Sequence, residues 1–310
     1  KVKVMDKTVN GDVKKVAQNL RAGEIMLLKN LRFNKGEAEN DPEFAKKLAD
    51  LGDVYVDDAF GATHRRHAST VGVANYLPGA SGLLLEKEVS VLKKLIEAPN
   101  RPFMACLGGN KISDKIGVIN QLLDVVDGII AGGGMCFTFL KAKGYEIGNS
   151  IVEEDQVGLA SEIIKKAEEN EVALYLPIDL VAAPEISKSA NYKVVSAKKV
   201  PEGWLGLDIG PASIEIYNQA LESAKTIFWN GPMGVFEIPQ FSRGTKAVAN
   251  AITEATRHGS LSIVGGGDSL AALKMFGLVD RVSFASTGGG ASLKILEGTA
   301  LPGVEVLEDR

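Results

Sequence analysis

Residues 103–115 read Phe-Met-Ala-Cys-Leu-Gly-Gly-Asn-Lys-Ile-Ser-Asp-Lys, a short apolar run that leads into a glycine corner and then a helical pattern. An unbroken apolar run of this length is typical of a strand buried on both faces, as in a parallel sheet. The amphipathic stretch that follows predicts the helix that returns the chain to a parallel neighbour. This segment therefore indicates an α/β fold.

The same order recurs along the chain. Strands are predicted at residues 25–29, 54–56, 103–107, 129–131, 173–176, 226–229, 261–264 and 281–285. Helices are predicted at 41–51, 86–97, 115–126, 155–170, 213–224 and 245–258. Strands that alternate with helices of this length favour parallel sheets with right-handed crossovers, and a doubly wound topology is the simplest arrangement.

The length of the chain and one stretch of turn-forming residues predict two domains. A chain of 310 residues exceeds the usual limit for one core. The pattern breaks at residues 78–82, Pro-Gly-Ala-Ser-Gly, and a helix of about residues 83–98 follows. That helix could connect two domains or lie at the edge of one, and composition does not separate these alternatives.

Composition narrows the class of protein. The net charge of -4 argues against a nucleic-acid partner. No apolar run approaches the ~20 residues that span a bilayer, and no signal peptide opens the chain, so no membrane partner and a cytoplasmic location are expected. Cys106 and Cys136 lie in apolar stretches and are predicted to be reduced core thiols. The chain opens on Lys1 in mid-pattern, which suggests a fragment or a processed chain.

Glycines follow five of the predicted strands. The corners are residues 108–109, 132–134, 231–234, 265–267 and 288–290. In open α/β sheets, ligands bind at the carboxyl ends of the strands, where glycine lets backbone N–H groups approach an anion. Five corners of this kind predict a nucleotide or phosphate site rather than a set of simple turns.

Two common phosphate signatures are absent. The dipeptide Gly-Lys does not occur, which excludes a Walker A loop. Gly132 and Gly134 are followed by Phe137, and Gly265 and Gly267 by Leu270, so neither triplet has the spacing of a dinucleotide fingerprint. A dehydrogenase that binds NAD is therefore a weak alternative.

Charged residues near these corners are candidate ligands. Lys111 and Lys115 are four apart and are expected to share one face of a helix start, where an anion would offset their position against the helix dipole. Asp268 directly follows a glycine corner and suits Mg²⁺, which takes one or two carboxylates and completes its shell with phosphate and water. A helix N-cap is the alternative role for Asp268, and the two roles can coexist.

A second group of cations lies nearer the start of the chain. Arg32 lies at the end of the first predicted strand, and Arg65 lies within His64-Arg-Arg-His67. The planar guanidinium group matches phosphate and carboxylate in two-point contacts. We interpret this cluster as a candidate anion pocket, with ordinary surface charge as the alternative. Two histidines without a third correctly spaced ligand argue against a metal site.

The motifs together resemble those of the phosphoglycerate kinase family, in order along nearly the whole chain. They are residues 30–33 (Asn-Leu-Arg-Phe), 58–61 (Asp-Ala-Phe-Gly), 64–65 (His-Arg), 107–115, 132–135 (Gly-Gly-Gly-Met), 206–211 (Gly-Leu-Asp-Ile-Gly-Pro), 229–237 (Trp-Asn-Gly-Pro-Met-Gly-Val-Phe-Glu), 265–268 (Gly-Gly-Gly-Asp), 286–293 and 301–303 (Leu-Pro-Gly). The resemblance implies two Rossmann-like domains and reversible phosphoryl transfer between ATP and 3-phosphoglycerate, giving ADP and 1,3-bisphosphoglycerate, with Mg²⁺, in glycolysis. It also implies a cytoplasmic monomer.

The resemblance also implies a domain plan. Residues 1–82 would form an incomplete phosphoglycerate-binding domain, 83–100 a connecting helix, 101–292 the nucleotide-binding domain, and 293–310 a segment that returns to the first domain. The family's first strand and its following arginine and histidine elements have no counterpart before Lys1.

Site residues follow from the same resemblance. Arg32, His64 and Arg65 would hold the phosphoglycerate. The nucleotide would contact Gly109, Lys115, Gly133, Gly206, Asn230, Glu237, Gly266, Gly267, Asp268 and Ser269, with Glu237 toward the ribose and Asp268 toward Mg²⁺. The transferred group would meet Arg32, Lys111, Lys115, Gly288, Gly289 and Gly290.

Some positions depart from the family pattern. Lys29 replaces a usual Glu, Asn34 a His, Asp57 an Asn, Arg66, Asn110 and Cys136 each an Ala, Ser269 a Thr, Phe284 a His and Lys294 a Glu. Ser269 retains the hydroxyl group, so nucleotide binding is expected to survive. The competing hypothesis is a nucleotide-binding fragment of the same enzyme that has lost catalysis with half of its acceptor pocket.

Overall fold

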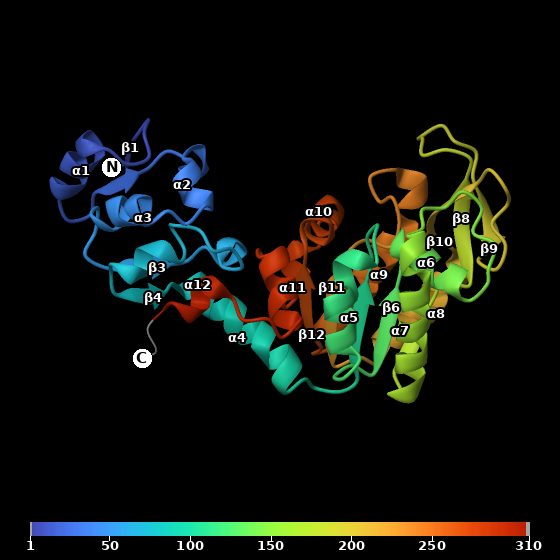
Figure 1. Ribbon diagram of the computed structural model, residues 1–310. Coiled ribbons are helices and arrows are strands. Elements are labelled where there is room, and N and C mark those ends of the chain that lie inside the picture. The colour runs from blue at the N-terminus through green and yellow to red at the C-terminus, as the bar shows by residue number, and fades with distance from the viewer. Residues whose placement is uncertain (1, 308–310) are drawn as a thin grey trace. The chain divides into compact units, whose positions relative to one another are not determined.

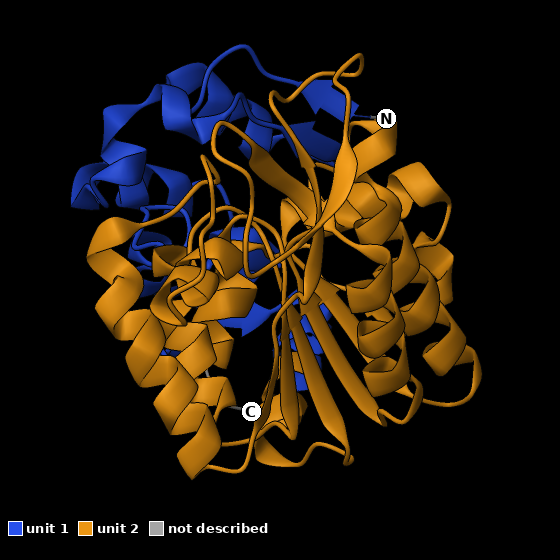
Figure 2. Cartoon of the chain, turned by 90° about the vertical axis from the view of Figure 1, so that its right-hand side faces the viewer, with its two compact units in different colours: residues 1–91, 298–310 blue, residues 92–297 orange. Residues whose placement is uncertain are grey.

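A computed structural model describes residues 2–307 of the chain. It divides into two compact units, the first made of residues 1–91 and 298–310 and the second of residues 92–297 (Figure 2). Helix α4 (Leu83–Glu97) contains the division between the units.

The core of the second unit is a six-stranded sheet in the order β13-β12-β11-β5-β6-β7 (Figure 1). Its strands are β5 (Phe103–Leu107), β6 (Gly128–Ala131), β7 (Ala173–Tyr175), β11 (Thr226–Asn230), β12 (Leu261–Gly265) and β13 (Phe284–Ala285). Every pairing is parallel, which confirms the predicted sheet type. Strands β5, β6 and β11 are buried along their whole length, as their unbroken apolar runs predict.

Helices cover both faces of this sheet. Its helices are α5 (Ile116–Leu122), α6 (Met135–Ala142), α7 (Val157–Glu169), α8 (Pro211–Glu222), α9 (Arg243–Arg257), α10 (Gly267–Phe276) and α11 (Gly290–Leu296). Tyr217 of α8, Val248 of α9 and Leu273 of α10 share one buried cluster with Cys106 and Trp229 of the sheet. Helix α5 packs against α11 over the opposite face (Figure 1).

A second sheet in this unit was not predicted. Strands β8 (Asp179–Ala183), β9 (Lys193–Ser196) and β10 (Leu205–Ile209) form an antiparallel sheet in the order β10-β8-β9. Exposed β9 and the glycine inside β10 give weak strand patterns, because neither has a continuous apolar run. Cys136, Phe137 and Leu140 of α6 pack beneath it with Leu180 and Ala182.

Two aspartates of this small sheet hold the starts of the helices that follow it. Asp179 accepts hydrogen bonds from the backbone N–H groups of Ala212 (3.0 Å) and Ser213 (2.8 Å) at the start of α8. Asp208 accepts one from Gly244 (2.7 Å) at the start of α9. A carboxylate satisfies the free N–H groups of a helix start and suits its dipole.

The first unit contains two separate two-stranded parallel sheets, β1-β2 and β3-β4. Its strands are β1 (Val2–Val4), β2 (Ile25–Leu27), β3 (Tyr55–Asp57) and β4 (Gly79–Ser81), and its helices are α1 (Gly11–Gln18), α2 (Lys35–Ala38), α3 (Pro42–Ala49) and α12 (Pro302–Glu305). Residues 298–307 pack within this unit, where the Gly303 N–H donates to the Thr63 carbonyl over 2.8 Å.

Several predicted boundaries were wrong. Arg32 does not end a strand, because β2 stops at Leu27 and Arg32 lies in a single 3₁₀ turn, Leu31–Phe33. The strand predicted at 281–285 shrinks to β13, since Val279–Arg281 form another 3₁₀ turn. Strands β1 and β4 and helices α1, α2, α6, α10, α11 and α12 were missed, most of them because they are short or begin at glycine or proline.

Tyr217 offers a test of this packing. Its buried hydroxyl group donates to the Ala131 carbonyl at the end of β6 over 2.7 Å. We expect Tyr217→Phe to lower the free energy of unfolding by about 1–2 kcal/mol in urea titrations, because the carbonyl loses a buried partner. Tyr192→Phe, at an exposed ring, is the control and should change little. Equal effects of the two substitutions would contradict a stabilising role of the hydrogen bond between Tyr217 and Ala131.

Candidate nucleotide and phosphoryl-transfer site

The five glycine corners lie at the same edge of the six-stranded sheet. Asn230 pairs in register with Leu107 on one side and Gly265 on the other, while Leu107 pairs with Ala131. Val264 of the neighbouring strand pairs with Ala285. Because parallel strands end together, all five corners follow adjacent strands at one edge, which confirms that part of the prediction.

Three of these corners touch one another through their backbones. The Gly108 N–H donates to the Asn230 carbonyl over 2.9 Å, the Gly109 N–H to Pro232 over 3.1 Å and the Gly133 N–H to Met233 over 3.0 Å. A Cβ atom on Gly231, which has φ of +101°, would lie 2.2 Å from the Gly108 carbonyl oxygen. Only glycine allows this approach, so the residue type follows from the contact between corners.

Lys115 and Asn230 form the polar centre of the edge. Lys115 is 8% exposed, and its ammonium group donates to the Oδ1 atom of Asn230, which is 3% exposed. Among the described residues, the buried Nδ2 atom of Asn230 has no hydrogen-bond partner. A Cβ atom on Gly266 would lie 3.0 Å from that Nδ2 atom. A buried cation and an unpaired donor thus sit beside the glycine corner of β12, as an anion site requires.

Lys111 and Lys115 do not share a helical face, which corrects the prediction. Helix α5 begins at Ile116, Lys115 closes a 3₁₀ turn (Ser113–Lys115), and Lys111 lies exposed in the loop before that turn. Burial lowers the pKa of Lys115, and the nearby charges of Asp114 and Asp268 oppose that shift. The two lysines therefore differ in environment, although both follow β5.

Helix α10 presents a second set of predicted residues. Its N-cap is Gly266, with φ of +91°, and no side chain caps it, so the N-cap alternative for Asp268 is wrong. Asp268 is exposed in the first turn, while Ser269 is buried and accepts a hydrogen bond from the Gly231 N–H over 2.6 Å. Ser269 therefore joins the corner of β12 to the corner of β11.

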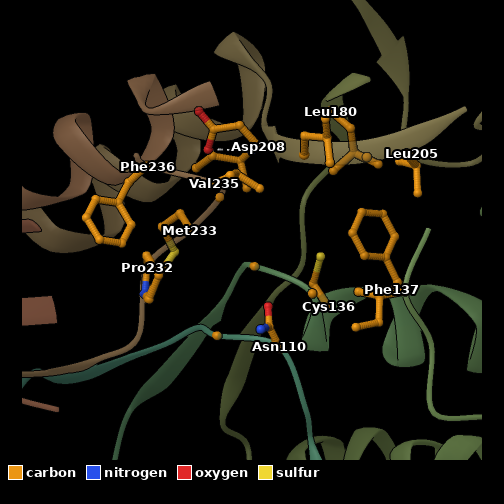
Figure 3. Close-up of a pocket in the computed structure, with 18 of the residues that line it drawn as sticks. Asn110, Cys136, Phe137, Leu180, Leu205, Asp208, Pro232, Met233, Val235 and Phe236 are labelled. Carbon is orange, nitrogen blue, oxygen red and sulfur yellow. Dashed lines mark hydrogen bonds between the residues drawn. The ribbon is translucent and has the colours of Figure 1, made fainter. Parts of the chain in front are cut away.

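A cavity of about 390 Å³ opens beside the corners. Gly109, Gly133, Gly206, Glu237 and Asp268 line it, all of them predicted site residues. Its apolar lining was missed by sequence reasoning: Phe137, Leu180 and Leu205 lie at one end, and Pro232, Met233, Val235 and Phe236 at the other (Figure 3). Apolar walls with few polar groups are typical of a site for a planar ring.

Asp208 is a further lining residue that was missed. It is 2% exposed and lies between Leu207 and Ile209 in β10. Burial raises the pKa of Asp208 to about 8, and hydrogen bonds from the backbone of Gly244, Ile209 and Arg243 oppose that shift. The sequence did offer one indication of a special role for Asp208, because a carboxylate is unusual within an apolar strand.

The corner after β13 contains the remaining predicted residues of this unit. The Gly288 N–H donates to the Ser286 hydroxyl over 3.3 Å, and its carbonyl accepts from Ala291 over 2.8 Å. Gly289 has φ of +43° and precedes α11, which begins at Gly290. These glycines share the sheet edge with the cavity, but they do not line it.

Arg32, His64 and Arg65 all lie in the first unit. The Arg65 Nε atom donates to the His64 Nε2 atom over 3.3 Å, and the side chain of Arg65 is exposed. Buried Glu37, in α2 just after Arg32, accepts from the Ser69 hydroxyl (2.6 Å) and the Ser69 N–H (3.1 Å). Glu37, which was not predicted, therefore ties the turn after Arg32 to the loop after Arg65.

Comparison with known proteins identifies the family. A family model described as phosphoglycerate kinase matches residues 1–299. The chain belongs to the phosphoglycerate kinase family. A phosphoglycerate kinase of Dictyoglomus turgidum is 52% identical over 309 residues, covering 100% of this chain and 78% of that protein. A cytosolic one of Nicotiana tabacum is 50% identical, with 99% and 77% covered, and a chloroplastic one of Volvox carteri is 50% identical, with 100% and 67% covered.

Solved structures of phosphoglycerate kinases support the same family assignment. The phosphoglycerate kinase of Coxiella burnetii superposes with a TM-score of 0.84 at 46% identity, covering 91% of this chain and 72% of that one. That of Pyrococcus horikoshii gives 0.85 at 29% identity, with 99% and 78% covered. The two-domain phosphoglycerate kinase fold is thereby confirmed, and so is the function: phosphoryl transfer between ATP and the carboxyl group of 3-phosphoglycerate in glycolysis, using a divalent metal with the nucleotide. The non-catalytic alternative is not favoured.

No helix within residues 2–307 is long and apolar enough to cross a membrane. The same part of the chain holds no cluster of three or more metal-binding side chains. A metal that arrives with the nucleotide needs no such cluster, because phosphate oxygens and waters supply most of its ligands.

The buried Lys115 predicts a pH dependence of stability. Since its pKa in the folded chain lies below the ordinary value of 10.5, the unfolded state binds more protons between these two values. The free energy of unfolding should therefore rise with pH across that interval, relative to a Lys115→Met chain that lacks the group. Urea titrations at several pH values measure the difference. Lys111→Met is the exposed control, and parallel curves for the wild-type and Lys115→Met chains would contradict the prediction.

Proposed function

We propose that the nucleotide lies in the cavity of the second unit. The base would pack among Phe137, Leu180 and Leu205, the ribose would face Glu237, and Gly109, Gly133 and Gly206 would contact the base and ribose through their backbones. The observation that supports this proposal best is the continuity of the apolar cavity with the glycine corners that surround Lys115 and Asn230. A nucleotide needs both an apolar surface and a cationic end.

The phosphate groups would extend from the cavity toward the sheet edge. Lys115, Asn230, Gly266, Gly267, Asp268 and Ser269 are the residues assigned to them. Lys115 has already lost its hydration by burial, so an anion beside it replaces the missing water.

Asp268 would hold the metal, and we assign that metal as Mg²⁺. The fit rests on chemistry: the side chain is a single exposed carboxylate in the first turn of α10. Mg²⁺ binds through one or two carboxylates together with phosphate oxygens and waters. When bound, the ion would neutralise charge on the phosphate groups.

The acceptor would bind in the first unit, at Arg32, His64 and Arg65. The phosphate group and the carboxylate group of phosphoglycerate are both anionic, and arginine binds such groups through two N–H donors at once. In this plan residues 1–82 bind the acceptor, 83–100 connect the domains, 101–292 bind the nucleotide, and 293–310 return to the first domain. Helix α4, Leu83–Glu97, supports the connector assignment because it contains the division between the units.

Catalysis would depend on position and charge. The acceptor carboxylate is already ionised, so no general base is required, and the task is to hold two anions that repel each other. Arg32, Lys111, Lys115 and the N–H groups of Gly288, Gly289 and Gly290 would stabilise the phosphoryl group in transfer. We further propose a cytoplasmic monomer without a nucleic-acid or membrane partner; the net charge of -4 argues against the nucleic-acid partner.

Asp268→Ala tests the metal assignment. We expect the Kd of Mg-ADP to rise roughly tenfold or more, because a charged contact is lost. Isothermal titration calorimetry with Mg²⁺ and with EDTA separates the metal contribution. Asp280→Ala removes an equal charge just beyond the other end of α10 and is the control. An unchanged Mg²⁺ dependence in Asp268→Ala would refute the role.

Arg65→Ala tests the acceptor site. The KM for 3-phosphoglycerate should rise by about tenfold or more, since a two-point contact with an anion is lost, while the Kd of Mg-ADP should stay the same. The neighbouring exposed Arg66 gives a matched control, because Arg66→Ala removes the same charge one residue away. If the two variants weaken binding equally, only general surface charge attracts the acceptor.

A further inference from the structure

We propose that Asp208 is a positioning residue for the nucleotide cavity, because its carboxylate fixes the start of α9 and lies against the loop of residues 231–237, which forms one wall of the cavity. The inference rests on the proposed nucleotide site and names a residue that supports that site without being assigned a contact to the reacting groups. Asp208 lies in the cavity lining, above the loop that carries Val235 (Figure 3).

Asp208 lies in an irregular strand. The pairing of β10 with β8 shifts register between Gly206 and Asp208, so one extra residue is accommodated there. A bulge of this kind redirects a side chain relative to a regular strand. Asp208 thereby becomes 2% exposed, in an interior where a carboxylate is costly without partners.

Both carboxylate oxygens of Asp208 accept hydrogen bonds from backbone N–H groups. Its Oδ1 atom accepts from the Ile209 N–H over 2.9 Å, and its Oδ2 atom accepts from the Gly244 N–H over 2.7 Å. Both oxygens are therefore used as acceptors. An asparagine would place an NH₂ group toward one of these N–H groups, so the acid cannot be replaced by its amide without losing a contact.

Two glycines lie close to the side chain of Asp208. A Cβ atom on Gly234 would lie 2.4 Å from the Oδ1 atom of Asp208, and one on Gly244 would lie 2.3 Å from it. Two glycines from different elements, the loop and α9, thus approach the same carboxylate more closely than any other residue type could. The loop and the helix start are both shaped around Asp208.

The loop itself forms one wall of the cavity. The Val235 N–H donates to the Leu207 carbonyl over 2.8 Å, and the Met233 N–H donates to the Thr245 hydroxyl over 3.0 Å. These bonds join the loop to β10 on one side and to α9 on the other, with Asp208 between them. A shift of Asp208 would consequently move Met233, Phe236 and Glu237, which line the cavity.

Asp179 provides a matched control. Like Asp208, Asp179 lies in the small sheet and accepts hydrogen bonds at a helix start, in this case from two N–H groups of α8. It also lies close to a glycine, since a Cβ atom on Gly210 would be 2.3 Å from the Cγ atom of Asp179. It is absent from the cavity lining. Asp179→Asn should therefore reproduce the loss of a helix cap without the loss of cavity shape.

The experiment compares Asp208→Asn, Asp179→Asn and wild type well below their unfolding midpoints. For Asp208→Asn we expect roughly tenfold weaker Mg-ADP binding and a similar rise in the KM for ATP, with kcat and the KM for 3-phosphoglycerate little changed. For Asp179→Asn we expect a comparable loss of thermal stability and unchanged Mg-ADP binding. Gly234→Ala inserts a methyl group against the same carboxylate and should also weaken Mg-ADP binding.

The outcomes separate the two proposals. If the wild-type chain binds Mg-ADP and Asp208→Asn binds it equally well, the positioning role is wrong while the nucleotide site stands. Equal weakening in Asp179→Asn would also overturn the inference, because a general loss of stability would then explain both. If the wild-type cavity residues do not respond to Mg-ADP at all, for example in chemical-shift mapping, the nucleotide site and the role of Asp208 fall together.

Discussion

The close approach of backbones at the carboxyl edge of the six-stranded sheet is the constraint on which the rest of the structure depends. Gly108 and Gly231 meet where a Cβ atom on either would collide with the other segment. The contact brings the ends of β5 and β11 together and aligns the peptide groups that follow.

That packing sets the electrostatics of the site. Lys115 is buried beside Asn230, whose Oδ1 atom is its hydrogen-bond partner, and the negative Asp268 lies near enough to influence its pKa. Removing an ammonium group from water costs free energy that one amide contact does not offset in full. The unliganded site therefore retains an unsatisfied preference for negative charge, which an incoming phosphate group can satisfy. Affinity for an anion and reduced stability of the empty site have the same origin.

Sequence patterns predicted the segments in which the local residue pattern and the tertiary packing favour the same structure. Continuous apolar runs gave β5 and β11 nearly to the residue, and the corners that follow them fell at one edge as expected. Prediction failed where tertiary contacts override local preference. Lys115, which was predicted to open helix α5, closes a 3₁₀ turn and donates to Asn230 instead, and the antiparallel sheet has short strands that are stabilised by packing on α6. No periodicity in the sequence marks such contacts.

Asp208 and Asp268 also show that local sequence does not predict a role that depends on tertiary contacts. Asp268 and Asp208 both follow or interrupt apolar strands near glycine, and local sequence alone favoured a helix cap for the first and gave no role to the second. The structure reverses this: Asp268 is exposed without capping, and Asp208 is buried and bonds to the start of α9. What separates them is burial, which depends on elements distant in sequence. In the proposed function the two carboxylates would have different tasks: Asp268 would be free to meet a metal, and Asp208 would be committed to the wall of the nucleotide cavity.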